Sequence, residues 1–258
     1  EEGGDQQQQT APTQLTQEEL ERAVEGKSAE EVDSMIASTN DRMAQLSAFW
    51  AGRKKEREAI KAKQEAEQQA AEKASSAIEE QKRAAQAAEA AAQELLANKV
   101  IAWCEGGREA GPRALRHRSI LADVRPRENW LRVNKIKGRE PWRPFAPIVL
   151  AEKAGGWFDG CPIPSPYMLF TAQVIDDGLP AITHVDGSSR IQTVDESCGG
   201  IYGILEAFDR ATGVPVLMNT SFNGPGEPIV ETPEQAIDFL LASDIDVVYV
   251  ECRRITRV

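Results

Sequence analysis

The sequence predicts a mixed α/β domain carried behind a long N-terminal α-helical arm. Residues 28–98 contain no proline and are dominated by Ala, Glu, Gln and Lys, the strongest helix formers. After Asn98, short apolar runs alternate with amphipathic runs, a pattern typical of strands alternating with helices. The 258 residues suffice for one ordinary domain together with such an arm.

The first 88 residues divide into a tail and an arm. Residues 1–27 are expected to be a polar, Gln-rich tail with a short helix, because this segment offers little apolar surface to bury. Residues 28–88 are expected to form the helical arm, which begins at a capping box because Ser28 precedes Glu31 by three positions. Gly52 is the one glycine inside the arm and marks a position where the helix could break.

The apolar residues from Arg53 to Ala97 are nearly all alanine, with Ile60 and Ile78 as exceptions. This composition lacks the Leu and Ile seam of a stable two-stranded coiled coil. Two interpretations fit it equally well. Either the alanines pack closely against a protein partner or a second copy of the chain, or the arm is a solvated spacer.

Residues 89–258 are expected to form the α/β domain, with four strands and two helices predicted from the apolar runs. Gly213 is placed to end the first of these helices in the left-handed conformation, and Thr232 with Pro233 marks the start of the second. The predicted strands are 99–104, 181–185, 215–222 and 245–250, and the predicted helices are 197–212 and 232–241.

Composition and charge exclude several classes of protein. The formal net charge of −11 argues against general attraction to nucleic acid or anionic lipid. The chain has no apolar stretch long enough to span a membrane and no charged-then-apolar leader, so we expect a cytoplasmic protein or one inside an intracellularly assembled particle. The four cysteines never occur as Cys-x-x-Cys and only two histidines are present, so no metal site is predicted.

Basic residues are concentrated between positions 108 and 143, where eleven Lys and Arg meet four Asp and Glu. Such an island in an acidic protein predicts a local anionic ligand. We expect Lys135, Lys137 and Arg139 to share one face of a strand at period two, where the aligned cations would hold an anion between them. A solvated basic face is the alternative, and the apolar residues of the following WRPFAP run weaken it.

Other candidate ligand-binding residues lie in turns near strand ends, where α/β proteins place ligands. Ser221 and Asn223 alternate onto one side of a strand end and can hydrogen-bond phosphate oxygens or a planar amide group. Asn-Gly is also a common turn sequence, so Asn223 could serve the turn alone. The remaining candidates are cations with planar guanidinium forks for phosphate or carboxylate, namely Arg113, Arg118, Arg143 and Arg190.

Six motifs occur in order after Ala90: GREAGPRAL, RSILAD, NKIKGREPWRPFAP, SPYM, HVDGSSRIQTV and NTSFNGPGEPIVETP. Together they closely resemble the C-terminal domain of O-carbamoyltransferases of the nodulation-factor and antibiotic-tailoring type. That domain is similar to the YrdC-like fold shared with threonylcarbamoyl-adenylate synthases. The Lys-x-Arg and Ser-x-Asn signature of those synthases is matched here by Lys137, Arg139, Ser221 and Asn223.

The resemblance implies a carbamoyltransferase-type enzyme that joins carbamoyl phosphate with ATP to give carbamoyl-adenylate and pyrophosphate. Its catalytic residues would be Lys137, Arg139, Ser221 and Asn223. ATP would be a substrate, and Mg²⁺ could accompany the ATP. In the family, a metal-containing N-terminal domain then transfers the carbamoyl group to a hydroxyl. Because the helical arm stands in its place here, we expect another chain to supply the acceptor domain. The implied substrate- and nucleotide-binding residues are Arg113, Arg118, Arg143 and Arg190.

Other functions remain open at this point. The arm favours a structural or assembly protein, such as a component of a phage or another large particle, which retains a nucleotide-binding fold. Nucleic-acid binding through residues 108–143 is a weaker alternative, because the chain is acidic elsewhere. A threonylcarbamoyl-adenylate synthase fits the GPRAL and RPFAP segments less well. One departure from the family is Arg116 with His117, where a Gly-Asn pair is usual.

Overall fold

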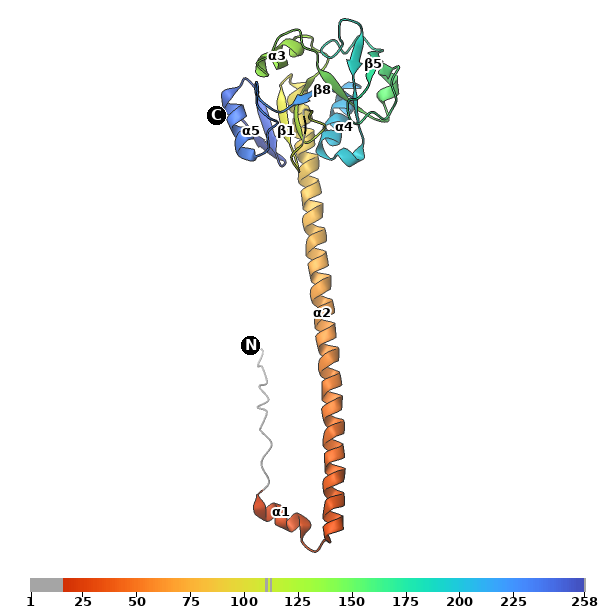
Figure 1. Cartoon of the computed structure of the whole chain (residues 1–258), viewed down its shortest axis with the longest axis vertical. Helices are drawn as coiled ribbons and strands as arrows, with labels where there is room; N and C mark the ends of the chain where they lie inside the picture. Colours follow the sequence, from red (N-terminus) through yellow and green to blue (C-terminus); the bar gives the residue numbers. More distant parts are fainter. Residues whose placement is uncertain (1–15, 110, 112, 258) are drawn as a thin grey trace, which may run out of the picture. The chain divides into compact units, whose positions relative to one another are not determined.

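The computed structural model describes residues 16–109, 111 and 113–257, and its helices and strands are drawn in Figure 1. The chain divides into two compact units, Glu1–Ala74 and Ser75–Val258. The boundary that we expected between arm and domain, after residue 88, lies inside the second unit. The part of the predicted tail that falls on residues 1–15 lies outside the described residues.

The first unit contains helix α1 (Gln17–Val24) and the beginning of helix α2 (Ala29–Leu96). α1 begins at a capping box in which Thr16 Oγ1 accepts the N–H of Glu19 and the Glu19 carboxylate accepts the N–H of Thr16. Ser28 and Glu31 make the same reciprocal pair at the start of α2, as the sequence predicted. The expected break at Gly52 is wrong, since α2 continues through it between segments of strong helix formers.

The second unit is built on a seven-stranded mixed sheet and a separate three-stranded antiparallel sheet (Figure 1). The strands are β1 (Ile101–Cys104), β2 (Arg118–Asp123), β3 (Ala146–Leu150), β4 (Phe158–Asp159), β5 (Thr171–Val174), β6 (Ser188–Arg190), β7 (Gln192–Val194), β8 (Val216–Ser221), β9 (Val247–Val250) and β10 (Arg253–Ile255). The large sheet has the order β10-β9-β1-β2-β8-β3-β7, and the small one has the order β4-β5-β6. β1 pairs with β9 and β3 with β7 in parallel, and the other neighbours are antiparallel.

The remaining helices cover the two faces of the large sheet. They are α3 (Glu128–Ile136), α4 (Gly200–Thr212) and α5 (Pro233–Ala242), with short 3₁₀ turns η1 (Ala154–Gly156) and η2 (Glu196–Cys198). In β1, Ala102 and Cys104 enter the core shared with α3 and α5, while Ile101 and Trp103 enter the core shared with α4 and the last turns of α2. This alternation is the period of two of a strand that is buried on both faces.

Most of the predicted elements of the second unit are confirmed. The runs at 99–104, 215–222 and 245–250 contain β1, β8 and β9, and the helices expected at 197–212 and 232–241 correspond to α4 and α5. Gly213 has φ 74° and ends α4 in the left-handed conformation. The mixed α/β domain preceded by a long helix is therefore the observed fold class.

Two expectations about local structure are wrong. Residues 181–185 form turns instead of a strand, because the Ile182 N–H and the Thr183 hydroxyl both bond locally to the Leu179 carbonyl. The segment from Lys135 to Arg139 is the end of α3 and the turn after it. The helix ends at Ile136, and Gly138 two positions later has a φ of +56°, which favours glycine, so the three cations of this segment do not share a strand face.

Candidate functional site

Lys137 is a buried lysine with neutral partners only, at the turn that follows α3. It is 6% exposed, and its Nζ donates hydrogen bonds to the main-chain oxygens of Ser221 (2.7 Å) and Asn223 (2.7 Å) and to Asn223 Oδ1 (2.5 Å). The Ser221 hydroxyl donates to the same Oδ1 at 2.7 Å. No carboxylate of the described residues forms an ion pair with this amine. The cluster is therefore a buried cation without a counter-ion.

The end of β8 and the loop after it hold the two partners of Lys137. Ser221 is the last residue of β8, and the Phe222 N–H donates to the Arg118 carbonyl oxygen at 2.9 Å. Asn223 Nδ2 donates to the Glu227 carbonyl oxygen at 2.7 Å, which closes the loop from 223 to 227. This asparagine thus serves the turn and also accepts a hydrogen bond from the lysine, and its role in ligand binding stays a prediction.

Gly138 brings the α3 turn against this loop. A Cβ at position 138 would lie 2.5 Å from Cγ of Pro225, closer than real side chains approach. Together with the positive φ, this contact makes glycine the residue that fits between Lys137 and Arg139. The glycine at position 138 is therefore required by the close packing of two loops.

The pKa of Lys137 is lowered from 10.5 to about 7, mainly by burial and also by the nearby charge of Arg139, while Glu227 acts in the opposite direction. Near neutral pH this amine is therefore only partly protonated. An anion bound beside it would stabilise the ammonium form and raise the pKa. The site is electrostatically prepared for a negatively charged ligand.

Arg139 continues the cationic site on the other side of Gly138. Its guanidinium carbon lies 4.3 Å from the centre of the Phe145 ring, and its Nε donates to Asn134 Oδ1 at 2.6 Å. Burial lowers the pKa of Arg139 to about 10, and the charge of Arg143 contributes in the same direction. Arg143 itself is half exposed and pairs with Glu140 at 2.9 Å, so it lies at the rim.

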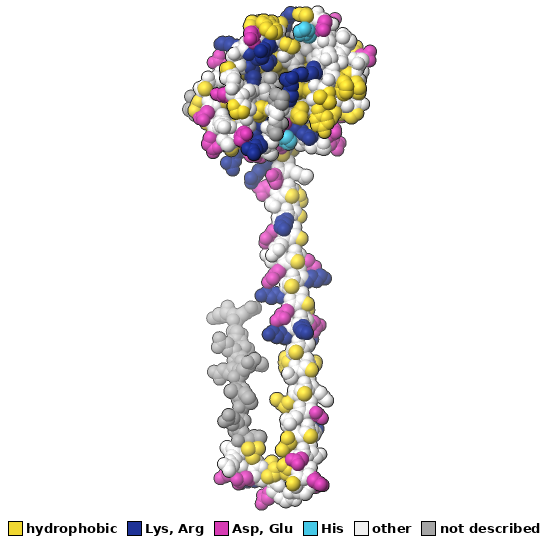
Figure 2. All heavy atoms as spheres, viewed as in Figure 1, with side chains coloured by type: hydrophobic (Ala, Val, Ile, Leu, Met, Phe, Trp, Pro, Cys, Tyr) yellow, Lys and Arg dark blue, Asp and Glu magenta, His cyan; other side chains and the backbone are white. Residues whose placement is uncertain are grey.

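Arg190 and Phe145 line one cavity of about 260 Å³. Arg190 ends β6, its Nε is buried without a hydrogen-bond partner in the described part of the chain, and burial lowers its pKa. The charge of the exposed Arg113 lowers the pKa of Arg190 as well, which places the two arginines near each other. Figure 2 shows Lys and Arg side chains gathered on one face of the second unit. The buried Nε of Arg190 is therefore a hydrogen-bond donor without an acceptor in the described part of the chain.

Arg118 differs from the other predicted cations. It is 4% exposed, and its guanidinium donates to the carbonyl oxygens of Glu105 (2.9 Å), His117 (2.8 Å) and Gly106 (3.0 Å). These bonds tie the segment after β1 to the start of β2. The side chain is directed at main-chain oxygens, so its assignment as a substrate-binding residue stays a prediction without support from these contacts.

The segment before β2 also contains an anion cradle that the sequence did not reveal. Oε1 of Glu109 accepts the main-chain N–H groups of Leu115 (2.8 Å), Arg116 (2.9 Å) and His117 (3.3 Å). Three convergent N–H groups are a typical means of binding an anion, and here the chain's own carboxylate fills the position. Arg116 also donates to Cys198 Sγ at 3.2 Å, so the Arg-His departure from the family pattern anchors this segment.

Asn219, two positions before Ser221 on β8, is a buried polar residue that the sequence analysis did not single out. It is 1% exposed, its Nδ2 donates to Gln192 Oε1 at 3.1 Å, and its Oδ1 is buried with no hydrogen-bond partner in the described part of the chain. On a strand, Asn219 and Ser221 share a face at period two. The alternation in Asn-Thr-Ser-Phe-Asn was the signal that could have identified it.

The structure thus places most of the predicted residues next to one another. Lys137, Ser221 and Asn223 are in direct contact, and Arg139 follows across Gly138. Phe145 connects Arg139 with Arg190, next to which Arg113 lies. Of the eight predicted site residues, Arg118 lies apart, inside the β1–β2 connection, and Arg143 lies at the rim, where its charge still acts on Arg139.

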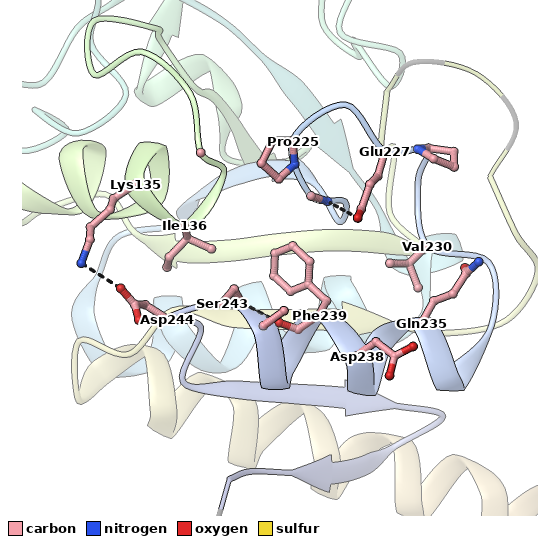
Figure 3. A pocket seen from close by; sticks show the side chains of 14 residues that line it. Lys135, Ile136, Pro225, Glu227, Val230, Gln235, Asp238, Phe239, Ser243 and Asp244 are labelled. Atoms are coloured by element: carbon pink, nitrogen blue, oxygen red, sulfur yellow. Dashed lines mark hydrogen bonds and ion pairs between the residues drawn. The ribbon is translucent and has the colours of Figure 1, made fainter.

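A larger pocket of about 640 Å³ is lined by the 224–230 segment, the end of α3 and α5 (Figure 3). Its charged lining residues are Lys135, Glu227, Asp238 and Asp244, and Lys135 Nζ pairs with Asp244 at 2.8 Å. This net negative lining does not suit a polyanion.

Within the described ranges, no group of three or more His, Cys, Asp or Glu side chains is arranged to hold a metal ion, and Mg²⁺ stays a prediction. No helix in the described part of the chain is long and apolar enough to cross a membrane.

Residues 92–257 match the family model described as Carbamoyltransferase C-terminus. The chain belongs to this family. It is 45% identical over 166 residues to nodulation protein NolO of Bradyrhizobium diazoefficiens, a match that covers 60% of this chain and 30% of that protein. It is 44% identical over 138 residues to 3'-hydroxymethylcephem-O-carbamoyltransferase of Amycolatopsis lactamdurans, with 53% of this chain and 26% of that protein covered. The matches thus span less than a third of the length of either relative.

Among solved structures, full-length HypF in its phosphate- and nucleotide-bound form aligns with 63% of this chain and 24% of its own. The sequence identity is 17% and the TM-score is 0.47. This likeness concerns the fold only, and nothing about ligands or activity follows from it. The resemblance to O-carbamoyltransferases that the six motifs predicted is confirmed by the family match.

Proposed function

We propose that this chain binds carbamoyl phosphate and ATP and forms carbamoyl-adenylate, and that a separate protein unit transfers the carbamoyl group to its acceptor. The observation that carries the proposal is the buried Lys137 amine, which has neutral partners only and lies beside Ser221 and Asn223. Membership of the carbamoyltransferase C-terminus family supports carbamoyl chemistry.

The cations have a clear task in such a reaction, because two polyanionic reactants must approach each other. Lys137 would exchange its neutral acceptors for phosphate oxygens, and Arg139 and Arg190 would neutralise further phosphate charge. The Ser221 hydroxyl and the Asn223 amide would orient the small carbamoyl group by hydrogen bonds. Their present bonds to each other and to Lys137 keep these groups at one place before the ligand arrives.

Atom balance defines the steps that the site would have to support. Carbamoyl-adenylate keeps the α-phosphate of ATP, so carbamoyl phosphate must lose its own phosphate group. Water cleaves carbamoyl phosphate to carbamate and orthophosphate, and a carbamate oxygen then attacks the α-phosphorus of ATP. The bond from the α-phosphorus to the bridging oxygen breaks, and pyrophosphate leaves. Both leaving groups carry negative charge, which is the charge that a cluster of cations stabilises.

A pyrophosphate exchange assay tests this proposal. The full chain is incubated with carbamoyl phosphate, ATP and labelled pyrophosphate, and label is expected to appear in ATP. The Ser221→Ala variant should slow the exchange about tenfold or more, as expected for loss of one positioned hydrogen bond. Lys135→Met is the matched control, because Lys135 is exposed and paired with Asp244. No exchange at high protein concentration, together with no binding of ATP by calorimetry, would reject the enzymatic function.

A structural or assembly role is the second candidate function, and one observation favours it. Eight large apolar side chains between positions 20 and 50 are exposed, which is unusual for a surface without a partner. They are Leu20, Val24, Met35, Ile36, Met43, Leu46, Phe49 and Trp50. Self-association without pyrophosphate exchange or ATP binding would favour this role over catalysis.

A further inference from the structure

The beginning of α2 presents an apolar stripe with the spacing of a coiled coil. The stripe consists of Val32, Ile36, Thr39, Met43, Leu46 and Trp50. Successive residues of the stripe are separated by four, three, four, three and four positions, which is the spacing of the heptad pattern. The side chains of Met43, Leu46 and Trp50 are 63%, 53% and 63% exposed. A second helix is the partner that matches this period.

The same unit contains a groove and a pair of aromatic rings, displaced from each other along α2. A cavity of about 490 Å³ lies between α1 and the start of α2, and Met35 and Thr39 are among its lining residues. Phe49 and Trp50 follow three turns later, in edge-to-face contact with ring centres 5.9 Å apart. Both rings are exposed, so the groove and the rings each lack a partner in the described part of the chain.

Charge is also segregated along this unit. Residues 16–33 contain seven acidic and two basic residues, and residues 53–63 contain six basic and two acidic residues. The apolar stripe lies between the two segments. If a second copy of this helix ran in the opposite direction, its basic segment would lie beside the acidic segment of the first copy. Its acidic segment would lie beside the basic segment of the first copy.

We propose that the chain pairs with a second copy of itself through this stripe, as an antiparallel dimer. In the alignment that matches the charges, Met43 faces Leu46 of the second copy, and Thr39 faces Trp50 of the second copy. The two-fold axis passes between Ala44 and Gln45. The rings of each copy then lie on the groove of the other, and the interface is self-complementary, as a two-fold contact requires. This pairing is independent of the activity proposed above.

Packing and charge favour this direction over a parallel dimer in register. The heptad positions continue into Arg53 and Arg57. In a parallel pair, each of these arginines would meet its own equivalent at the seam, and like charges there are destabilising. In the antiparallel pair, Arg53 and Arg57 lie beside Ile36 and Val32 and close to the acidic segment. The small Thr39 is also opposite the large Trp50, so the layers fill evenly.

The first test is the mass and the direction of the pair in the full chain. Light scattering coupled to size exclusion should give about twice the 28.3 kDa of one chain at tens of micromolar protein. A zero-length carbodiimide cross-link is expected between Asp33 and Lys54, which flank the seam in this alignment. The two residues are about 30 Å apart along one continuous helix, so a link between them must join two chains.

Two sets of variants complete the test. Met43→Asp with Leu46→Asp should give a monomer, and Ile78→Asp, at a similarly exposed residue of α2 outside the stripe, should leave the dimer intact. Asp33→Lys should weaken the dimer about fivefold or more, and adding Lys54→Asp should restore it while helix content stays constant. A monomer at high concentration, links between equivalent residues of two chains, or failure of the charge exchange to restore pairing would each overturn the proposal.

Discussion

Replacing Lys137 by methionine removes a buried positive charge while keeping an unbranched stem of similar length. The folded-state pKa of about 7 lies below the unfolded-state value near 10.5, so the unfolded chain binds more protons between these two pH values. Stability of the wild-type domain therefore rises with pH across this window and is lowest below pH 7. In the variant, this contribution to the pH dependence is absent.

The magnitude follows from the same two values. At acidic pH, the difference between these two pKa values lowers the unfolding free energy by about 5 kcal/mol, because the ammonium is buried in the folded state. Each unit of pKa difference is worth about 1.4 kcal/mol. The variant also loses the hydrogen bonds to Ser221 and Asn223, worth about 1 kcal/mol each. The two effects oppose each other at pH 6. The stability difference between wild type and variant should then change by about 2–3 kcal/mol, in favour of wild type, between pH 7 and pH 9.

Chemical unfolding of the full chain at several pH values measures this difference directly. Groups that titrate elsewhere affect wild type and variant alike and cancel in the comparison. Lys135→Met serves as the control, because Lys135 is 77% exposed and should leave the pH dependence of stability unchanged. Calorimetry of pyrophosphate binding at pH 8, in buffers with different ionisation enthalpies, should also show uptake of about one proton by wild type only.

The reasoning is refuted if wild type and Lys137→Met have the same pH dependence of stability. It is equally refuted if pyrophosphate binds to the wild type at pH 8 without proton uptake. Either result would mean that the Lys137 amine is already fully charged near neutral pH in the folded chain.

Three more variants test the geometry of the site. Gly138→Ala forces a side chain into positive φ and against Pro225, so we expect about 1–3 kcal/mol lower unfolding free energy and at least tenfold weaker ATP binding by calorimetry. Arg190→Gln should weaken pyrophosphate binding about tenfold or more with an unchanged melting temperature, while Arg210→Gln, at an exposed ion pair, should change neither. Glu109→Gln removes the charge from a carboxylate that accepts three main-chain N–H groups, so the melting temperature should fall by about 2–6 °C, and an unchanged value would contradict the anchoring role.

Local signals in the sequence predicted those features that depend on neighbouring residues. Capping at Ser28, the left-handed end of α4 at Gly213 and the start of α5 at Thr232 each depend on interactions within a few positions. The charge pattern likewise identified the basic segment that contains Lys137 and Arg139. The misassigned strand shows the limit of this approach. Cations at alternating positions also fit the last turn of a helix, and only the packing of Gly138 against Pro225 distinguishes the two.

The sequence by itself determined the long helix, three of the strands (β1, β8 and β9) and the types of residue available for an anionic ligand, because propensity, capping and charge act over short distances. Only the tertiary structure decided which of these residues meet. Lys137 and Ser221 are 84 positions apart and come into contact because α3 packs beside the end of β8. The same packing removes the lysine from water and lowers its pKa, and burial of this kind depends on atoms from the whole fold.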